Sequence, residues 1–202
     1  MKLKKLILSA TAFILLCGAS FAQDGPAYPY STNLSFTAST GTVTGYNMYR
    51  APYTSGACGT FAKLNATPFT GLTYSDVNPP QGFYCYVATA VSTQGESGYS
   101  NIDSNIAIPA PPPTGLGATV ASVNGVNETT FAWANPETKG LTGNKIHCKS
   151  GKTKFGVIVN TSAPVDELRL VQPAGYYTCG VTVISSGNVE SGISNEVGYT
   201  VE

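Results

Sequence analysis

The chain contains a single histidine, His147, which lies between Lys145 and Lys149 in an alternating stretch. A Ser–His–Asp hydrolase would hold such a base in a cleft, beside a serine and an oxyanion donor. The sequence has no Gly-x-Ser-x-Gly turn that could present a serine nucleophile. We therefore expect His147 to be a surface residue on the outward side of a strand. We predict no catalytic residue and a protein that is not an enzyme.

Metal chemistry has equally little support in the sequence. Adjacent residues of a strand point to opposite sides of the sheet, so His147 and Cys148 cannot readily share one metal ion. The acidic pair Asp166-Glu167 falls in an expected turn, where two solvated carboxylates are the ordinary outcome. We expect no metal site and no cofactor.

Two groups of side chains suit binding better than catalysis. Lys145, His147 and Lys149 would project from one strand face and could contact an acidic glycan or protein. A solvated face that deters edge-to-edge pairing is the commoner role of such charges. Tyr49 is expected to project outward, with Tyr53 following in a loop. Exposed tyrosines can stack on sugars or anchor a protein contact, although cross-strand packing is their ordinary use.

The number of cysteines limits the possible disulfide pairings. Beyond the N-terminal region the chain has four, Cys58, Cys85, Cys148 and Cys179. In an exported chain four cysteines allow three pairings. Two fall in each half, so Cys58–Cys85 and Cys148–Cys179 are the simplest pairs, each worth about 3 kcal/mol on the chain-entropy model. Buried free thiols are the alternative.

The N-terminus has the features of a secretory signal peptide. Three lysines precede an apolar run from Leu6 to Cys17, and Ala19-Ser20-Phe21-Ala22 follows. The run is too short for a comfortable membrane span. We predict cleavage after Ala22 and a secreted protein. Cys17 could instead carry a lipid, but the bulky Leu16 before it disfavours a lipoprotein signal.

Composition and charge limit the classes of partner that the protein is expected to bind. Removing residues 1–22 takes three of the 11 Lys and Arg residues and none of the 11 Asp and Glu residues, which leaves 8 − 11 = −3. Such a mild charge predicts neither nucleic acid nor an anionic membrane as a partner. Charged residues make up only 11% of the chain. This composition, rich in Gly, Ser, Thr, Tyr and Val, is typical of an all-β extracellular protein.

An internal repeat predicts the strands that position these residues. Residues 82–101 read GFYCYVATAVSTQGESGYSN, and residues 175–195 read GYYTCGVTVISSGNVESGISN. Each copy predicts a strand followed by Glu-Ser-Gly-x-Ser-Asn, which we assign to turn chemistry rather than to a ligand. The repeat predicts two domains, 23–109 and 114–202, joined by a stiff proline-rich linker over 109–113. Turns recur every 8–12 residues without helical periodicity, the rhythm of a β-sandwich.

Four motifs of the first copy resemble a bacterial fibronectin type III domain. They are Gly-Tyr-x-x-Tyr-Arg from Gly45, Lys-Leu-Asn from Lys63, Tyr-x-Tyr-x-x-Thr-Ala-Val from Tyr84 and Glu-Ser-x-x-Ser-Asn from Glu96. The resemblance covers roughly 27–109 and, more weakly, 113–202. It implies an all-β fold class of two tandem immunoglobulin-like β-sandwiches, which would follow the cleaved signal peptide predicted above. It also implies seven strands in two sheets per domain.

The second copy departs from the family pattern at two positions of its Gly143 strand. Asn144 stands where the first copy has a tyrosine, and Cys148 stands where it has Arg50. The resemblance also implies corner tyrosines, at Tyr84 in the first copy and Tyr177 in the second.

The implied strand order sharpens the disulfide prediction. In the second copy Cys148 and Cys179 both fall on inward positions of neighbouring antiparallel strands, within bridging range. In the first copy Cys85 points outward, and Cys58 lies in a loop that could fold over it.

The first copy opens with the irregular stretch 23–32, so its first strand is abbreviated. That leaves part of a sheet edge open for strand addition by a partner. We predict a secreted, non-enzymatic binding or adhesion protein, or an extracellular structural protein, built of two fibronectin type III modules. A carbohydrate- or cell-wall-binding module protein is the alternative. The partner is expected to be a protein or a glycan, with self-association as a further expectation, and with neither nucleic acid nor a membrane span involved.

Overall fold

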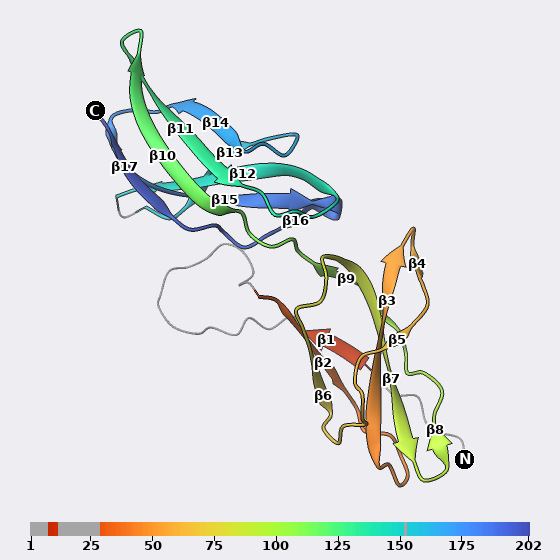
Figure 1. Ribbon diagram of the computed structural model, residues 1–202. Coiled ribbons are helices and arrows are strands. Elements are labelled where there is room, and N and C mark those ends of the chain that lie inside the picture. The colour runs from red at the N-terminus through yellow and green to blue at the C-terminus, as the bar shows by residue number, and fades with distance from the viewer. Residues whose placement is uncertain (1–7, 12–28, 152) are drawn as a thin grey trace. The chain divides into compact units, whose positions relative to one another are not determined.

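The computed structural model describes residues 8–11, 29–151 and 153–202 (Figure 1). The chain divides into two compact units, the first containing β1 (Leu8–Thr11) and Pro29–Ile108, the second Pro109–Glu202. Apart from one 3-10 turn at Ser186–Asn188, every regular element among these residues is a β-strand. The predicted cleavage site after Ala22 and the alternative lipid site at Cys17 lie outside the described residues.

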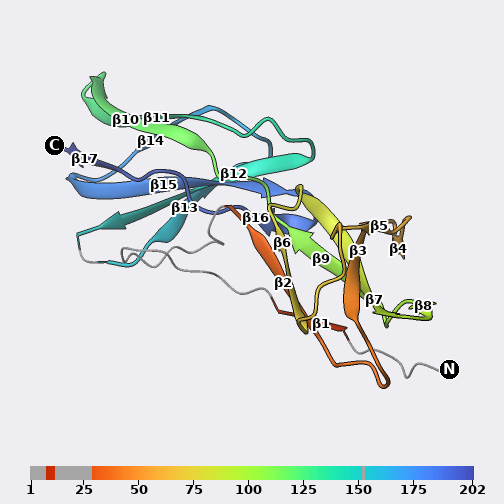
Figure 2. The ribbon, with the colours of Figure 1, turned by 60° about the horizontal axis from the view of Figure 1, so that its bottom comes forward.

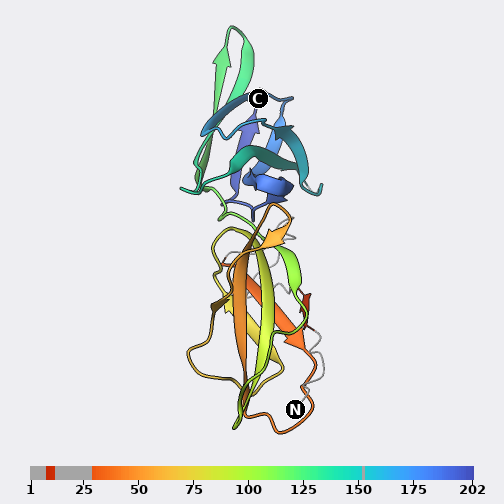
Figure 3. The same cartoon turned by 90° about the vertical axis from the view of Figure 1, so that its right-hand side faces the viewer.

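Two antiparallel sheets form the first unit. One has the order β1-β2-β6, with β2 at Ser31–Phe36 and β6 at Thr73–Val77. The other is built on β3 (Gly45–Thr54) and β7 (Gly82–Ser92), which run side by side in Figure 3. The short strands β4 (Ala57–Cys58) and β5 (Ala62–Lys63) pair with β3, while β8 (Gly95–Glu96) and β9 (Asp103–Ile108) pair with β7.

The core of the first unit follows the alternation of its strands. Tyr86, Ala88 and Ala90 of β7 point inward, as their spacing predicts, and pack with Leu34 and Phe36 of the facing sheet. All five side chains are buried, so the two sheets close over one apolar layer.

An ion pair also joins the two sheets of the first unit. Arg50 Nη1 lies 2.7 Å from Oδ2 of the buried Asp76, and the Tyr86 hydroxyl donates a hydrogen bond to the same oxygen at 2.9 Å. The Arg50 guanidinium also lies 4.9 Å from the centre of the Tyr84 ring. Because each charge here has a partner, the pair fixes how β3 faces β6 without leaving a lone buried charge.

The second unit repeats the plan, with longer first and second strands. One sheet has the order β10-β11-β14, with bounds Thr114–Val123, Val126–Ala134 and Glu167–Val171. The other is centred on β12 (Leu141–Ser150) and β15 (Gly175–Ser185). β13 (Gly156–Asn160) flanks β12, and β16 (Val189–Glu190) and β17 (Val197–Val201) pair with β15.

The second core is filled by one residue or two from each main strand. Phe131, Ile146 and Val181 are fully buried at its centre, and the lone tryptophan, Trp133, is 6% exposed within the same cluster. The Tyr177 hydroxyl donates a hydrogen bond to the carbonyl of Pro173 at 3.0 Å, as a corner tyrosine does. This contact ties the start of β15 to the connection that precedes it.

Both predicted disulfides are present. Cys58–Cys85 and Cys148–Cys179 join residues whose Cα atoms are 5.9 Å and 4.1 Å apart. Cys148 stands directly opposite Cys179 in the β12–β15 register, and both belong to the core. Cys58 lies on β4, which folds back beside the end of β3, and from there it reaches Cys85 on β7. The two units are therefore crosslinked at different places, as predicted.

The start of the first unit contains an element that the sequence did not predict. In the described part of the chain β2 begins at Ser31, within the stretch 23–32, and β1 from the expected signal peptide holds the outer position beside β2 (Figures 1 and 2). The outer edge of β2 is thus occupied in this structure.

Candidate functional site

The repeated Glu-Ser-Gly-x-Ser-Asn motif lies along the edge of the central sheet of each unit. The hydroxyls of Ser97 and Ser191 accept hydrogen bonds from the amides of Ala90 and Val183, at 2.9 Å and 3.0 Å. The amides of the same two serines donate to the carbonyls of those partners. Each serine thereby continues the strand ladder where the chain leaves it. The motif has the structural role that its turn chemistry indicates.

The glutamate that opens the motif gathers polar side chains on the outward face of the first unit. Glu96 Oε1 accepts hydrogen bonds from Asn47 Nδ2 at 2.8 Å, from the Tyr49 hydroxyl at 2.6 Å and from the Thr89 hydroxyl. Burial, and then the Glu96 hydrogen bond, raise the pKa of Tyr49 to about 12. Burial alone would raise the pKa of Glu96, but its three hydrogen bonds outweigh that effect and lower it.

An aromatic cluster of Tyr49, Phe61 and Tyr99 lies beside this carboxylate. The ring centres of Tyr49 and Tyr99 are 5.4 Å apart, and those of Phe61 and Tyr99 are 5.3 Å apart. Tyr99 is 55% exposed, so about half of this residue faces solvent. Tyr53 is half-buried four residues further along β3, opposite Cys58 in the β3–β4 hairpin. Tyr49 is therefore brought together with two rings that the sequence had not singled out.

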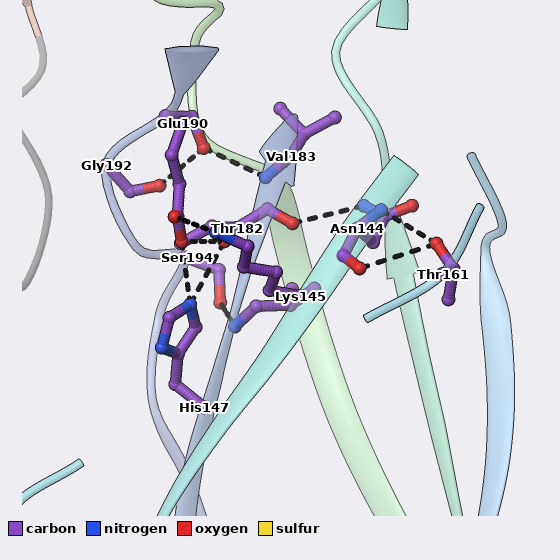
Figure 4. A network of polar contacts seen from close by, with 11 residues as sticks. Asn144, Lys145, His147, Thr161, Thr182, Val183, Glu190, Gly192 and Ser194 are labelled. Carbon is purple, nitrogen blue, oxygen red and sulfur yellow. Dashed lines mark hydrogen bonds and ion pairs between the residues drawn. The ribbon is translucent and has the colours of Figure 1, made fainter. Parts of the chain in front are cut away.

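In the second unit Glu190 holds the equivalent position and gathers a lysine and a histidine (Figure 4). Its Oε2 lies 2.6 Å from Lys145 Nζ, and its Oε1 accepts hydrogen bonds from His147 Nε2 at 2.8 Å and from the Thr182 hydroxyl at 2.7 Å. Burial opposes ionisation of Glu190, yet the hydrogen bonds and the Lys145 charge lower its pKa. A charged carboxylate is the form that this site stabilises.

The expectation that His147 is a surface residue is wrong, because its exposed fraction is 5%. The ring does lie on the outward side of β12, since the neighbours Ile146 and Cys148 belong to the core. Glu190 and Thr182 then cover it from the adjoining strands. His147 is a buried hydrogen-bonding residue whose Nε2 is engaged.

Lys149, the third member of the predicted cationic face, is also paired. Its ammonium group lies 3.5 Å from Glu196 Oε2 and 4.2 Å from the centre of the Phe155 ring. Lys145 and Lys149 thus each face a carboxylate. Such pairing reduces the field that a free anion would experience at this face.

The arrangement of sheets in each unit identifies the fold once it is compared with solved structures. The chain is similar to a two fibronectin type III domain segment from chicken tenascin, with 13% sequence identity, a TM-score of 0.50 and coverage of 85% of this chain and 91% of that one. The fold is that of two tandem fibronectin type III domains.

Two further similar structures have lower scores. They are the FN1-FN3 domains of chicken CNTN1 (17% identity, TM-score 0.41, 88% of this chain and 63% of that chain) and the chicken interferon gamma receptor alpha chain (14%, 0.45, 85% and 92%). No protein-family model matches the chain, and no curated protein matches it. The likeness therefore concerns the fibronectin type III fold alone.

The departure at Asn144 has a structural explanation within this fold. Its buried side chain donates a hydrogen bond to Asn135 Oδ1 at 2.7 Å and accepts one from the amide of Val165 at 3.0 Å. Its own amide donates to the Thr161 hydroxyl at 2.8 Å (Figure 4). The polar side chain therefore holds the β11–β12 connection at Asn135 and the β13–β14 connection at Val165.

Within residues 8–11, 29–151 and 153–202, no three His, Cys, Asp or Glu side chains are grouped so that they could hold a metal ion. The same residues contain no helix with the length and apolar character of a membrane span.

The sequence did carry a signal for the two carboxylate clusters. Glu96 and Glu190 stand at the same place in the repeated motif, and Tyr49 and His147 stand at the same outward position of the matching strands. Strand alternation predicted that Tyr49 and His147 point outward, but it could not indicate that a carboxylate from a later strand covers them.

Proposed function

We propose that the chain is an exported, non-catalytic binding protein that contacts its partner through the aromatic cluster of its first fibronectin type III unit. The observation that carries this proposal is the exposed ring of Tyr99 resting on Tyr49 and Phe61. Exposed tyrosines give a large contact area at low conformational cost, which suits adhesion to a protein or a surface.

The engagement of His147 supports a non-catalytic role. A general base must come within reach of a substrate proton. His147 is 5% exposed, and Glu190 and Thr182 lie against its Nε2, so a substrate does not reach this side of the ring. The two disulfides and the basic–apolar N-terminal segment are what an exported protein carries.

The experiment compares Tyr99→Ala with Tyr176→Ala for binding of the labelled protein to intact cells of the producing organism. Tyr176 is the matched control because it is an exposed tyrosine of the second unit, at 57% against 55% for Tyr99. Loss of an aromatic anchor should weaken binding by about tenfold or more. Equal binding by both variants would contradict the proposal.

Carbohydrate binding is the second candidate, because the Tyr99 ring lies next to the charged, hydrogen-bonding Glu96 cluster. Sugar-binding sites combine an aromatic ring for the apolar face of a sugar with polar groups for its hydroxyls. Pull-down with cellulose, chitin and peptidoglycan tests this candidate directly. Retention of the parent protein and of Tyr176→Ala, but not of Tyr99→Ala, would favour a glycan over a protein partner.

A further inference from the structure

The strand β1 takes the place of the first strand of the first fibronectin type III unit. It pairs antiparallel with β2, Leu8 opposite Phe36 and Ala10 opposite Leu34, and gives the sheet order β1-β2-β6 (Figures 1 and 2). In the second unit β10 occupies the same position in the order β10-β11-β14.

The two strands also match in sequence and, over residues 9–11 and 117–119, in register, while Leu116 lies at a register shift of β10. β1 reads Leu-Ser-Ala-Thr, and residues 116–119 of β10 read Leu-Gly-Ala-Thr. Ala10 stands opposite Leu34, and Ala118 stands opposite Phe131, the repeat equivalent of Leu34. In β10 the leucine of this motif, Leu116, is buried in the core. The edge of β2 therefore accepts the same kind of strand that completes the second unit.

The strand that fills this edge comes from the segment whose removal the sequence predicts. Cleavage after Ala22 would leave only residues 23–30 ahead of β2. That stretch contains Pro26 and Pro29, which have no amide hydrogen to donate to a ladder, and it would also have to reverse direction before Ser31. The exported chain would then begin at a strand whose outer backbone groups lack a neighbour.

We propose that leader removal converts β2 into an acceptor for an extended segment of a different protein, which adds antiparallel with a Leu-x-Ala-Thr type of pattern. Backbone hydrogen bonds along Asn33–Phe36 would supply the affinity, and alternating apolar and small polar residues would supply the selectivity. The pairing of β1 with the edge of β2 is the observation behind this proposal. The proposal rests on the proposed export of the chain but not on the aromatic cluster.

The test uses the chain of residues 23–202 and two synthetic probes. One is KKLILSAT, residues 4–11, and the other is TGLGATVA, residues 114–121. Hydrogen exchange is measured for residues 31–36, with residues 126–134 as the internal reference. At saturation each probe should slow exchange in 31–36 by about tenfold or more and leave the reference unchanged. The control KKLILPAT, in which proline replaces Ser9, should have no effect.

Three results would overturn the proposal. Residues 31–36 could be fully protected in the chain 23–202 without any probe, which would mean that its own N-terminal stretch completes the sheet. Protection could rise with protein concentration alone, which would make a second copy the occupant. N-terminal sequencing of the exported protein could also find residues 8–11 still attached. The Tyr99→Ala chain should bind both probes normally, so failure of the proposed function is distinguishable from failure of this inference.

Discussion

Glu96 and Glu190 occupy the same position in the two units, and each carboxylate accepts hydrogen bonds from side chains of the two central strands of its sheet. The donors differ: an asparagine and a tyrosine in the first unit, a lysine and a histidine in the second. The same geometry therefore holds β8 and β16 against their sheets, although the donor side chains differ between the two units. Because the second set includes a charged donor and a buried ring, Glu190 should matter more to stability than an exposed glutamate.

Glu190→Gln should destabilise the second unit by about 1–3 kcal/mol, the usual effect of losing a charge-assisted hydrogen bond at a partly buried site. Urea unfolding monitored by Trp133 fluorescence measures it. The control is Glu167→Gln, whose carboxylate pairs with Arg169 on the surface, where both side chains are more than half exposed. That change should alter stability by less than about 0.5 kcal/mol. Equal effects would mean that the Glu190 contacts contribute nothing specific.

Stability should fall when the pH is lowered below 4.5, the ordinary pKa of these glutamates. The folded protein holds the pKa of Glu96 and of Glu190 below that value, so the unfolded chain binds protons first as the pH falls. The stabilisation is complete above pH 4.5 and is lost as the pH drops through the lowered folded-state pKa values. Urea midpoints between pH 7 and pH 3 measure the loss, and the slope should be shallower for Glu190→Gln. An unchanged slope would contradict the assignment of the effect to this carboxylate.

Tyr177→Phe should cost about 1 kcal/mol, because it removes the hydrogen bond to the carbonyl of Pro173 and little else. Tyr176→Phe is the neighbouring control, since this tyrosine is 57% exposed. It should stay within about 0.5 kcal/mol of the parent. Thermal unfolding of both variants checks the prediction, and a larger loss for Tyr176→Phe would count against a corner role for Tyr177.

Gly143→Ala should destabilise the second unit by about 1–3 kcal/mol, as overpacking does. A Cβ at this position would overlap the carbonyl oxygen of Thr161, a backbone atom that cannot rotate away. The first unit has the same requirement at Gly45, where a Cβ would lie 2.8 Å from the Cβ of Pro68. Gly117→Ala is the control, because nothing lies within 4 Å of its added carbon. Equal melting temperatures for Gly143→Ala and Gly117→Ala would contradict the prediction, because they would show that the segment at Thr161 shifts to accommodate the added carbon.

The features that the sequence predicted correctly depend on short-range order. The period of two along β7 determines that Tyr86, Ala88 and Ala90 face inward, because successive residues of a strand alternate. The Cys148–Cys179 pairing followed from the same alternation together with the strand order that the fibronectin type III resemblance implies. Alignment of the lone tryptophan with the core residue Phe36 of the first copy also indicates a core position, and Trp133 lies in the core of the second unit.

The features that the sequence missed depend on segments distant along the chain. His147 is buried because Glu190, which lies 43 residues later, folds back over it. Tyr99 rests on Tyr49, 50 positions earlier, which no local pattern indicates. The pairing of β1 with β2 was missed for a different reason, since an apolar leader is normally interpreted as an export signal and not as part of a sheet.

The position of the two disulfides determines how far the protein can be stretched. A fully extended chain gains about 3.3–3.6 Å per residue. The cysteines of the second unit are 31 residues apart, so under mechanical load their crosslink withholds about 100 Å of contour length. The 27-residue loop of the first unit withholds about 90 Å more. Reduction of the two disulfides would release this contour length, so the extensibility of the protein under tension should depend on the redox state of its surroundings.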